Sequence, residues 1–411
     1  MEFKKFDWIG RQEFSAVKRV MRSKQLSGFY GNWGEKFEGG KEVIGFEREC
    51  EEYFEIKHAI TFNSLASGLS AAIGALGIGP GDQVILPPWT MSASAAAILH
   101  WGGIPVFADI DERTYCIDPK SVESLVNSRT KAIIAVDIFG QSSNIEQLKR
   151  IAHKFNLKIV SDTAQAIGAT RHNKYAGTLA DIGGISLNYH KHIHTGEGAV
   201  MFTNDDNLAL RLKLIRNHAE AVVGDIPFEV NLVNMVGHNY RLSEIQAAIG
   251  REQLKKLTKI TSTRKTETDL LRRKLIKFEE IIPPFVDDGN THVFYMYAMQ
   301  LKLSNLTITK SQFVQELKKL GVPGLSDKYI NLHLLPIFQN KIAIGKHGFP
   351  WTYDQSSSQV SYTKGICPVA EKLQDETYFS FYINDYFITK SEVSFIYRSF
   401  EKVIQKYSRS S

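Results

Sequence analysis

The stretch of sequence that decides the fold is DIGGISLNYHKHIHTGEG, residues 181–198. It begins as an apolar strand, becomes polar around Lys191 and ends in a Gly-x-Gly sequence. Lys191 would then lie just past the carboxyl end of a strand, where open α/β sheets form their ligand crevices. The stretch therefore predicts a strand of such a sheet, with Lys191 either a nucleophile in the crevice or an ordinary solvated loop lysine.

Outward from this stretch, short β-rich runs alternate with helical patterns from about residue 58. This alternation is typical of parallel strands joined by crossover helices, so we expect an α/β fold with a mostly parallel central sheet flanked by helices. One expected helix, 67–76, ends at the glycine- and proline-rich GIGPG of residues 77–81. The expected strands are 83–87, 105–110, 131–139, 158–162, 182–187 and 199–203.

The length of 411 residues exceeds the roughly 250–300 at which one hydrophobic core usually stops growing. After about residue 257 the pattern changes to a lysine-rich helix followed by mixed strands and helices. We therefore expect a large α/β domain over residues 1–256 and a smaller C-terminal α+β domain over residues 257–411.

The composition, with 43% hydrophobic and 23% charged residues, is that of an ordinary globular protein. No apolar run is long enough to span a membrane and no signal-type core follows Met1, so we expect a soluble cytoplasmic protein. The net charge of +6 comes without long basic blocks, which indicates an anionic small ligand rather than nucleic acid. Three widely spaced cysteines indicate neither a disulfide framework nor a zinc site.

A second informative segment is KIVSDTAQA, residues 158–166, in which an apolar strand ends at Asp162 and an amide, Gln165, follows. A carboxylate buried at a strand end needs a cationic partner, because an unpaired buried charge is costly. The alternative is that Asp162 caps a following helix.

Two further segments open helices, and one carries a group of histidines. NSLASGL, residues 63–69, offers small residues and free N–H groups to a phosphate, and GHNYRLSE, residues 237–244, is a polar loop whose Ser243 could simply cap a helix. His190, His192 and His194 lack a nearby cysteine or carboxylate pair, so we expect no metal site.

Taken in this order, the segments resemble the DegT/StrS family of pyridoxal-phosphate-dependent sugar aminotransferases, within the fold-type I aspartate aminotransferase superfamily. The resemblance covers roughly residues 20–400. It is carried by Ser186-x4-Lys191 with TGEG at 195–198, by Asp162-x2-Gln165, by GIGPGD at 77–82 and by NYR at 239–241.

The resemblance implies a role for each matching residue. Lys191 would form a Schiff base with pyridoxal phosphate, and Asp162 would pair with the ring nitrogen. Gln165 would bond the ring's phenolic oxygen. The phosphate would be held by Ser186, by the backbone at Ala66 and Ser67, and by Asn239 of a neighbouring subunit. Similar enzymes are homodimers with shared active sites, so we expect the same here.

The sequence also departs from the family pattern. The phosphate loop reads Ser64-Leu65-Ala66-Ser67 where relatives commonly have Ser-Gly-Thr-Ala. One face of the ring, usually covered by an aromatic residue, would be covered by Met91 together with Trp89. Core packing is the alternative for both residues.

Two residues are candidates for substrate contact. Trp33 lies in a glycine-rich stretch, residues 28–40, and a surface turn is the alternative there. His333 aligns with a loop that borders the sugar site in similar enzymes.

The function expected from the resemblance is transfer of an amino group, from L-glutamate, to a nucleotide-linked keto-sugar in amino-sugar, surface-polysaccharide or secondary-metabolite biosynthesis. The alternatives are a pyridoxal-phosphate enzyme on a free sugar acid, a keto-cyclitol or a small keto-phosphate, and a non-catalytic cofactor-binding regulator. A sugar dehydratase is less favoured, because relatives of that kind carry histidine where this chain has Lys191.

Overall fold

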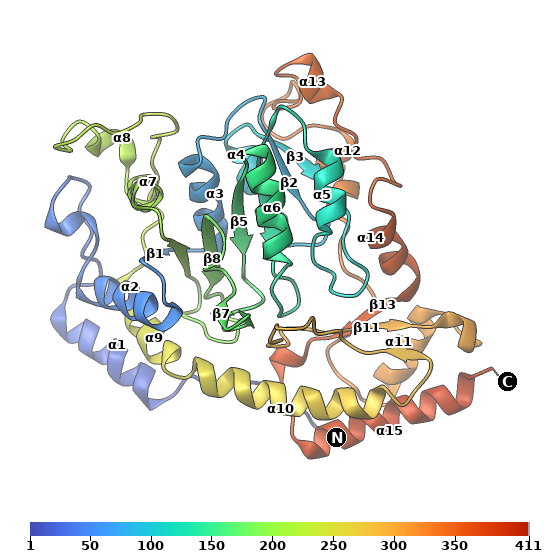
Figure 1. Cartoon of the computed structure of the whole chain (residues 1–411). Helices are drawn as coiled ribbons and strands as arrows, with labels where there is room; N and C mark the ends of the chain where they lie inside the picture. The colour runs from blue at the N-terminus through green and yellow to red at the C-terminus, as the bar shows by residue number, and fades with distance from the viewer. Residues whose placement is uncertain (410–411) are drawn as a thin grey trace.

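The structure is a computed structural model that describes residues 1–409. Its centre is a seven-stranded sheet in the order β1-β9-β8-β5-β4-β2-β3 (Figure 1). Only β9 runs against its neighbours; the other pairings from β8 to β3 are parallel. The strands are β1 (His58–Phe62), β2 (Gln83–Leu86), β3 (Ile104–Phe107), β4 (Thr130–Val136), β5 (Lys158–Asp162), β8 (Ile182–Ser186) and β9 (Ala199–Thr203).

The six expected strands are confirmed, and their expected carboxyl ends run up to three residues too far. The edge strand β1 is an additional one. Strands β2, β3, β8 and β9 are buried at every residue, which explains why they read in the sequence as continuous apolar runs.

Helices cover both faces of the sheet, because side chains alternate between the faces along each strand. On β2, Val84 and Leu86 pack in the core under α3, α4 and α7, whereas Ile85 packs on the opposite face with α5 and α6. Helices α2 and α9 extend this second face over β8 and β9. The helices of the two faces and of the chain before α10 are α1 (Arg11–Ser23), α2 (Lys41–Phe54), α3 (Leu65–Ala75), α4 (Ser92–His100), α5 (Pro119–Leu125), α6 (Ile145–Phe155), α7 (Asp206–Arg216), α8 (Ala219–Val222) and α9 (Glu244–Leu254).

A second, antiparallel sheet in the order β10-β11-β13-β12 forms the smaller part of the molecule. The long helix α10 (Leu257–Leu275) reaches from the first sheet to this part, where it lies beside α15 (Lys390–Tyr407) (Figure 1). The other elements of this part are β10 (Ile281–Ile282), β11 (Tyr297–Leu301), α11 (Lys310–Lys319), β12 (Leu325–Ser326) and β13 (Tyr378–Phe381).

The segment between β12 and β13 returns to the first core, where Leu332, Phe338, Trp351 and Tyr362 are buried. The division at residues 256 and 257 therefore separates the two sheets but not every packing contact, and it stays a prediction. The remaining strands and α-helices are β6 (Thr170–Arg171), β7 (Lys174–Tyr175), α12 (Pro336–Gln339), α13 (Gln355–Ser358) and α14 (Pro368–Lys372). None of the helices in the described part of the chain combines the length and apolar character needed to cross a bilayer.

Candidate active site

A cavity of about 1020 Å³ opens at the carboxyl edge of the large sheet. The segments that follow β2, β5 and β8 form one side of it, because the carboxyl ends of parallel strands meet at one edge. Tyr295, Tyr329 and Tyr382, from the part of the chain after α10, form the other side. The predicted site residues that line the cavity are Ala66, Met91, Asp162, Gln165, Ser186 and Lys191.

Lys191 lies in the turn after β8, where its backbone N–H donates to the carbonyl of Asn188 at 2.9 Å. Lys191 is only 8% exposed, so it is not a solvated loop lysine. Burial lowers the pKa of the Lys191 amine to about 8, although the negative charge of Asp162 acts in the opposite direction. A lysine amine with this pKa is partly uncharged near neutral pH and can act as a nucleophile.

Tyr295 is the closest polar neighbour of this amine. Its hydroxyl lies 3.4 Å from Nζ of Lys191, and the amine lies 4.4 Å from the centre of the tyrosine ring. Nearby, the side-chain amide of Asn384 donates to the carbonyl of His190 at 2.8 Å. Two residues from the part of the chain after α10 thus hold Lys191 and the turn that presents it.

The pH dependence of Lys191 can be measured directly on the protein without cofactor. Because its pKa is about 8 rather than the ordinary value of about 10.4, roughly 10² times more of it is uncharged at pH 7. Acylation of Lys191 should rise as pH increases through 8 and level off above it, with exposed Lys131 as the reference on the same peptide map. If acylation of Lys191 and of Lys131 showed the same pH dependence, the lowered pKa of Lys191 would be contradicted.

Asp162 ends β5 and is 4% exposed. Both carboxylate oxygens accept hydrogen bonds, Oδ2 from the Ser94 hydroxyl at 2.7 Å and Oδ1 from the N–H of Ala164 at 3.1 Å. Residues 163–166 form turns, so Asp162 does not cap a helix. Burial raises the pKa of Asp162, while the Ser94 and Ala164 bonds and the charge of Lys191 oppose this.

Gln165 is held so that its amide nitrogen remains available. Its carbonyl oxygen accepts from the N–H of Phe139 at 2.9 Å, and its nitrogen donates to the hydroxyl of Tyr329 at 3.2 Å. An amide nitrogen carries two hydrogens, so one remains for an acceptor in the cavity.

The start of α3 closes one end of the cavity with Ser64, Leu65 and Ala66. Ser64 caps this helix, and its hydroxyl accepts from the N–H of Ser67 at 3.2 Å. Gly184 of β8 permits the close approach: a Cβ there would lie 2.6 Å from Cδ1 of Leu65. Free N–H groups and the helix dipole thereby face the cavity beside Ser186, an arrangement that favours a phosphate.

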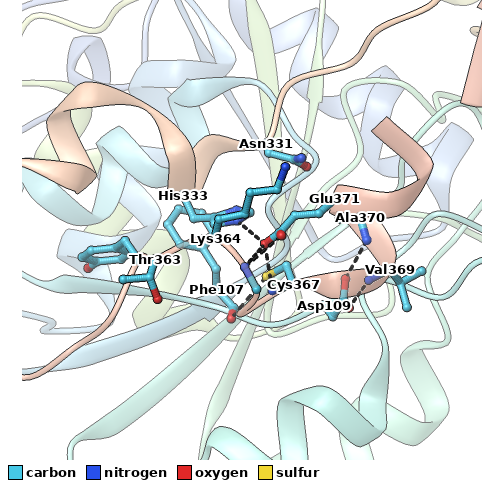
Figure 2. A network of polar contacts seen from close by, with 12 residues as sticks. Phe107, Asp109, Asn331, His333, Thr363, Lys364, Cys367, Val369, Ala370 and Glu371 are labelled. Atoms are coloured by element: carbon cyan, nitrogen blue, oxygen red, sulfur yellow. Dashed lines mark hydrogen bonds and ion pairs between the residues drawn. The ribbon is translucent and has the colours of Figure 1, made fainter. Parts of the chain in front are cut away.

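Trp89 and His333 do not line the cavity. Trp89 is fully buried, and its indole nitrogen donates to Oδ1 of Asn331 at 2.7 Å, in agreement with the packing alternative. His333 is also fully buried, and Figure 2 shows it pointing to Glu371, 2.9 Å from Nε2 to Oε1. Glu371 in turn accepts from the backbone N–H of Cys367, so His333 anchors the start of α14.

Three other candidates lie elsewhere. Trp33 packs against Phe37 and Phe228. Ser67 is half-buried behind Ser64. Asn239 is exposed and outside the cavity lining, so its part in a partner's site stays a prediction.

The histidines near Lys191 are not grouped with other side chains that could bind a metal ion, in the part of the chain that the structure describes. His192 is fully buried, with Nε2 lying 2.9 Å from the carbonyl oxygen of Val293, and burial lowers its pKa to about 3. Across residues 1–409 there is no group of three or more His, Cys, Asp or Glu side chains placed to hold a metal ion.

Sequence reasoning missed Ser94, Tyr295, Tyr329 and Asn384. Each forms a hydrogen bond with a residue between 68 and 194 positions away in the chain, so no local sequence motif predicts the contact. The one usable signal was the aromatic run at residues 292–297, HVFYMY, which is too apolar to lie on a surface.

These residues fit pyridoxal phosphate. The cavity holds a nucleophilic amine, a spare amide N–H and a helix start suited to a phosphate. It also holds Asp162, a buried carboxylate that none of the ion pairs in the described part of the chain includes. A protonated ring nitrogen would supply the cation that this carboxylate lacks.

The fold and this site define the class of fold-type I pyridoxal-phosphate enzymes. The profile of the DegT/DnrJ/EryC1/StrS aminotransferase family matches residues 10–378, and the chain belongs to this family of pyridoxal-phosphate-dependent sugar aminotransferases. The resemblance seen in the sequence is thereby confirmed, together with the cofactor and the transaminase class.

Individual relatives agree with this assignment. The GDP-perosamine synthase of Caulobacter vibrioides is 35% identical over 298 residues, which are 72% of this chain and 78% of that protein. The L-glutamine:2-deoxy-scyllo-inosose aminotransferase of Streptoalloteichus tenebrarius is 29% identical over 88% of this chain and 85% of that protein. The crystal structure of an aminotransferase from Psychrobacter cryohalolentis superposes with a TM-score of 0.82 at 27% identity, over 98% of this chain and 99% of the other. The chain is a sugar or cyclitol aminotransferase.

Proposed function

We propose that the enzyme transfers an amino group from L-glutamate to a nucleotide-linked keto-sugar. The observation that carries this proposal is the extent of the cavity. Besides the residues suited to the cofactor, its lining includes hydroxyl, amide and carboxylate groups, those of Tyr329, Tyr382, Asn384 and Asp385. Such groups can bond the hydroxyls of a sugar ring.

The charges in the same lining support an anionic acceptor. Lys5 and Lys328 line the cavity, and both are exposed at their positions, so they can meet a diphosphate without the cost of burying an unpaired charge. The GDP-linked product in the name of the Caulobacter relative is consistent with such an acceptor.

The roles of the chain's own residues follow from their placement. Bound pyridoxal phosphate supplies an aldehyde and a ring that accepts negative charge from the amino-bearing carbon of a substrate. Lys191 would bond the aldehyde and, once displaced by the donor's amine, carry a proton to and from the reacting carbon. Asp162 would hold the proton on the ring nitrogen, while Ser186 and the start of α3 would bind the phosphate. Gln165 would orient the ring through its phenolic oxygen.

A keto-cyclitol is the second candidate acceptor, because one relative is named for 2-deoxy-scyllo-inosose and for L-glutamine as donor. The test is a pair of half-reactions followed by absorbance. We expect L-glutamate to convert the aldehyde form of the bound cofactor to the amine form, and GDP- or UDP-linked keto-sugars to convert it back. Reaction with a keto-cyclitol alone would favour the second candidate, and no reaction with any donor would contradict both.

We also propose a homodimer in which Asn239 reaches the phosphate site of the partner subunit. Its exposure on the segment before α9 leaves its side chain available for such a contact. Mixed dimers of Lys191→Ala and Asn239→Ala subunits test this arrangement.

A further inference from the structure

A chain of two hydroxyls leads from the cavity to Asp162. Ser94, fully buried on α4, lies 2.7 Å from Oδ2 of Asp162. The hydroxyl of Thr90 lies 2.8 Å from that of Ser94, and Thr90 is 1% exposed at the cavity wall. All three residues are therefore shielded from water.

The chemistry of the groups orders the protons along this chain. An ionised carboxylate can only accept hydrogen bonds, so the Ser94 hydroxyl must donate to Asp162. The single proton of Ser94 is then used, which leaves Thr90 to donate to the oxygen of Ser94. Both O–H dipoles consequently point toward the carboxylate and favour its charged form.

We propose that Ser94, supported by Thr90, is a positioning residue that keeps Asp162 ionised and correctly oriented for the cofactor's ring nitrogen. The carboxylate is held at both oxygens, by Ser94 on one and by the N–H of Ala164 on the other, so it cannot rotate freely. Burial alone raises the pKa of Asp162, and the Ser94 bond is the largest opposing influence. Without Ser94 the carboxylate would hold its own proton more readily and pair less well with a protonated ring.

Helix capping does not account for the Ser94 hydroxyl. The residue before α4, Met91, makes no side-chain capping bond, and the backbone N–H of Ser94 already donates to the carbonyl of Met91 at 3.2 Å. The hydroxyl is directed to Asp162, 68 positions away in the chain. A merely structural role for Ser94 would stabilise the fold without depending on the ring nitrogen, and this difference can be measured.

The experiment compares the affinities of the folded apoprotein for pyridoxal phosphate and for its 1-deaza analogue, in which CH replaces the ring nitrogen. We expect Ser94→Ala to weaken binding of pyridoxal phosphate by about 10-fold or more, the loss typical of a hydrogen bond to a charged group. The deaza analogue should bind the variant and the wild type alike. Ser92→Ala, at an exposed position of the same helix, is the matched control and should bind both ligands as the wild type does.

Two further measurements make the result decisive. In an Asp162→Ala background, Ser94→Ala should cause no further loss of affinity, because the residue through which it acts is gone. As pH falls, the affinity of Ser94→Ala should decline at a higher pH than that of the wild type, since its Asp162 takes up a proton more readily.

Thr90→Val, which keeps the shape of the side chain, should weaken cofactor binding in the same direction but less, and it serves if Ser94→Ala does not fold. Equal losses for pyridoxal phosphate and the deaza analogue, or no loss for either, would overturn the proposal. Binding of pyridoxal phosphate by the wild type is measured first, so the assignment of Ser94 is tested separately from the acceptor proposed above.

Discussion

Lys191→Ala is expected to lower transamination by at least about 10⁴-fold, because the variant lacks both the nucleophile and the group that moves the proton. The Lys191 side chain is buried and lines the cavity, and the neighbouring Tyr295 hydroxyl cannot replace the amine as a nucleophile toward the aldehyde. Borohydride reduction followed by peptide mapping should attach the cofactor to Lys191 in the wild type. The variant should show no covalent label.

The matched control is Lys131→Ala, at an exposed position near the start of β4, which should keep full activity.

The Lys191→Ala variant also tests whether the two subunits share each active site. In mixed dimers of Lys191→Ala and Asn239→Ala subunits, one site combines an intact Lys191 with an intact Asn239 of the partner, so activity should exceed that of either variant alone. Normal turnover by Lys191→Ala would refute the mechanism, and failure to complement would refute the role of Asn239.

Asp162→Asn is expected to reduce turnover by about 10²–10³-fold, the usual loss when one preorganised electrostatic contact to a developing charge is removed. Asparagine has nearly the same shape, and its oxygen can still accept from the N–H of Ala164. The amide nitrogen that replaces Oδ2 cannot accept from Ser94, and the negative charge is lost. The effect should fall mainly on kcat of the half-reaction with L-glutamate, measured in single turnovers, with a smaller change in the apparent donor affinity.

Asp137→Asn is the informative comparison for Asp162→Asn. Asp137 is also fully buried, one strand away, but its carboxylate is bonded by Ser143, Ser161 and Thr163 and does not line the cavity. We expect this variant to lose stability more than turnover. If Asp162→Asn and Asp137→Asn reduced turnover equally, Asp162 would have no special relation to the cofactor.

The fold was predictable because its central strands are buried on both faces and therefore read as apolar runs with clear ends. The positions of Asp162 and Lys191 were predictable for the same reason: Asp162 ends β5, Lys191 follows β8, and the topology brings the carboxyl ends of these strands together. The position of each residue relative to a strand end, more than its residue type, predicted that it would lie in the crevice.

The placement of Trp89 could not be predicted from strand position. Alternation along a strand would put Trp89 and Met91 on one face, but β2 ends at Leu86 and both residues lie in the connection to α4. Trp89 is consequently buried, whereas Met91 is 68% exposed at the cavity. The contacts of Ser94 and Tyr295 depend on packing between distant segments, which no local pattern encodes.

The bond from Asn384 to the turn that carries Lys191 has a consequence for engineering. A chimera that exchanged the C-terminal third of the chain to change the acceptor would also replace the residues that hold the reactive amine in place, Asn384 and Tyr295. An exchange of this region intended to change the acceptor would therefore also change the contacts of Lys191. Directed evolution of this enzyme should gain more from single substitutions around Tyr382 and Lys328 than from swapping the whole region.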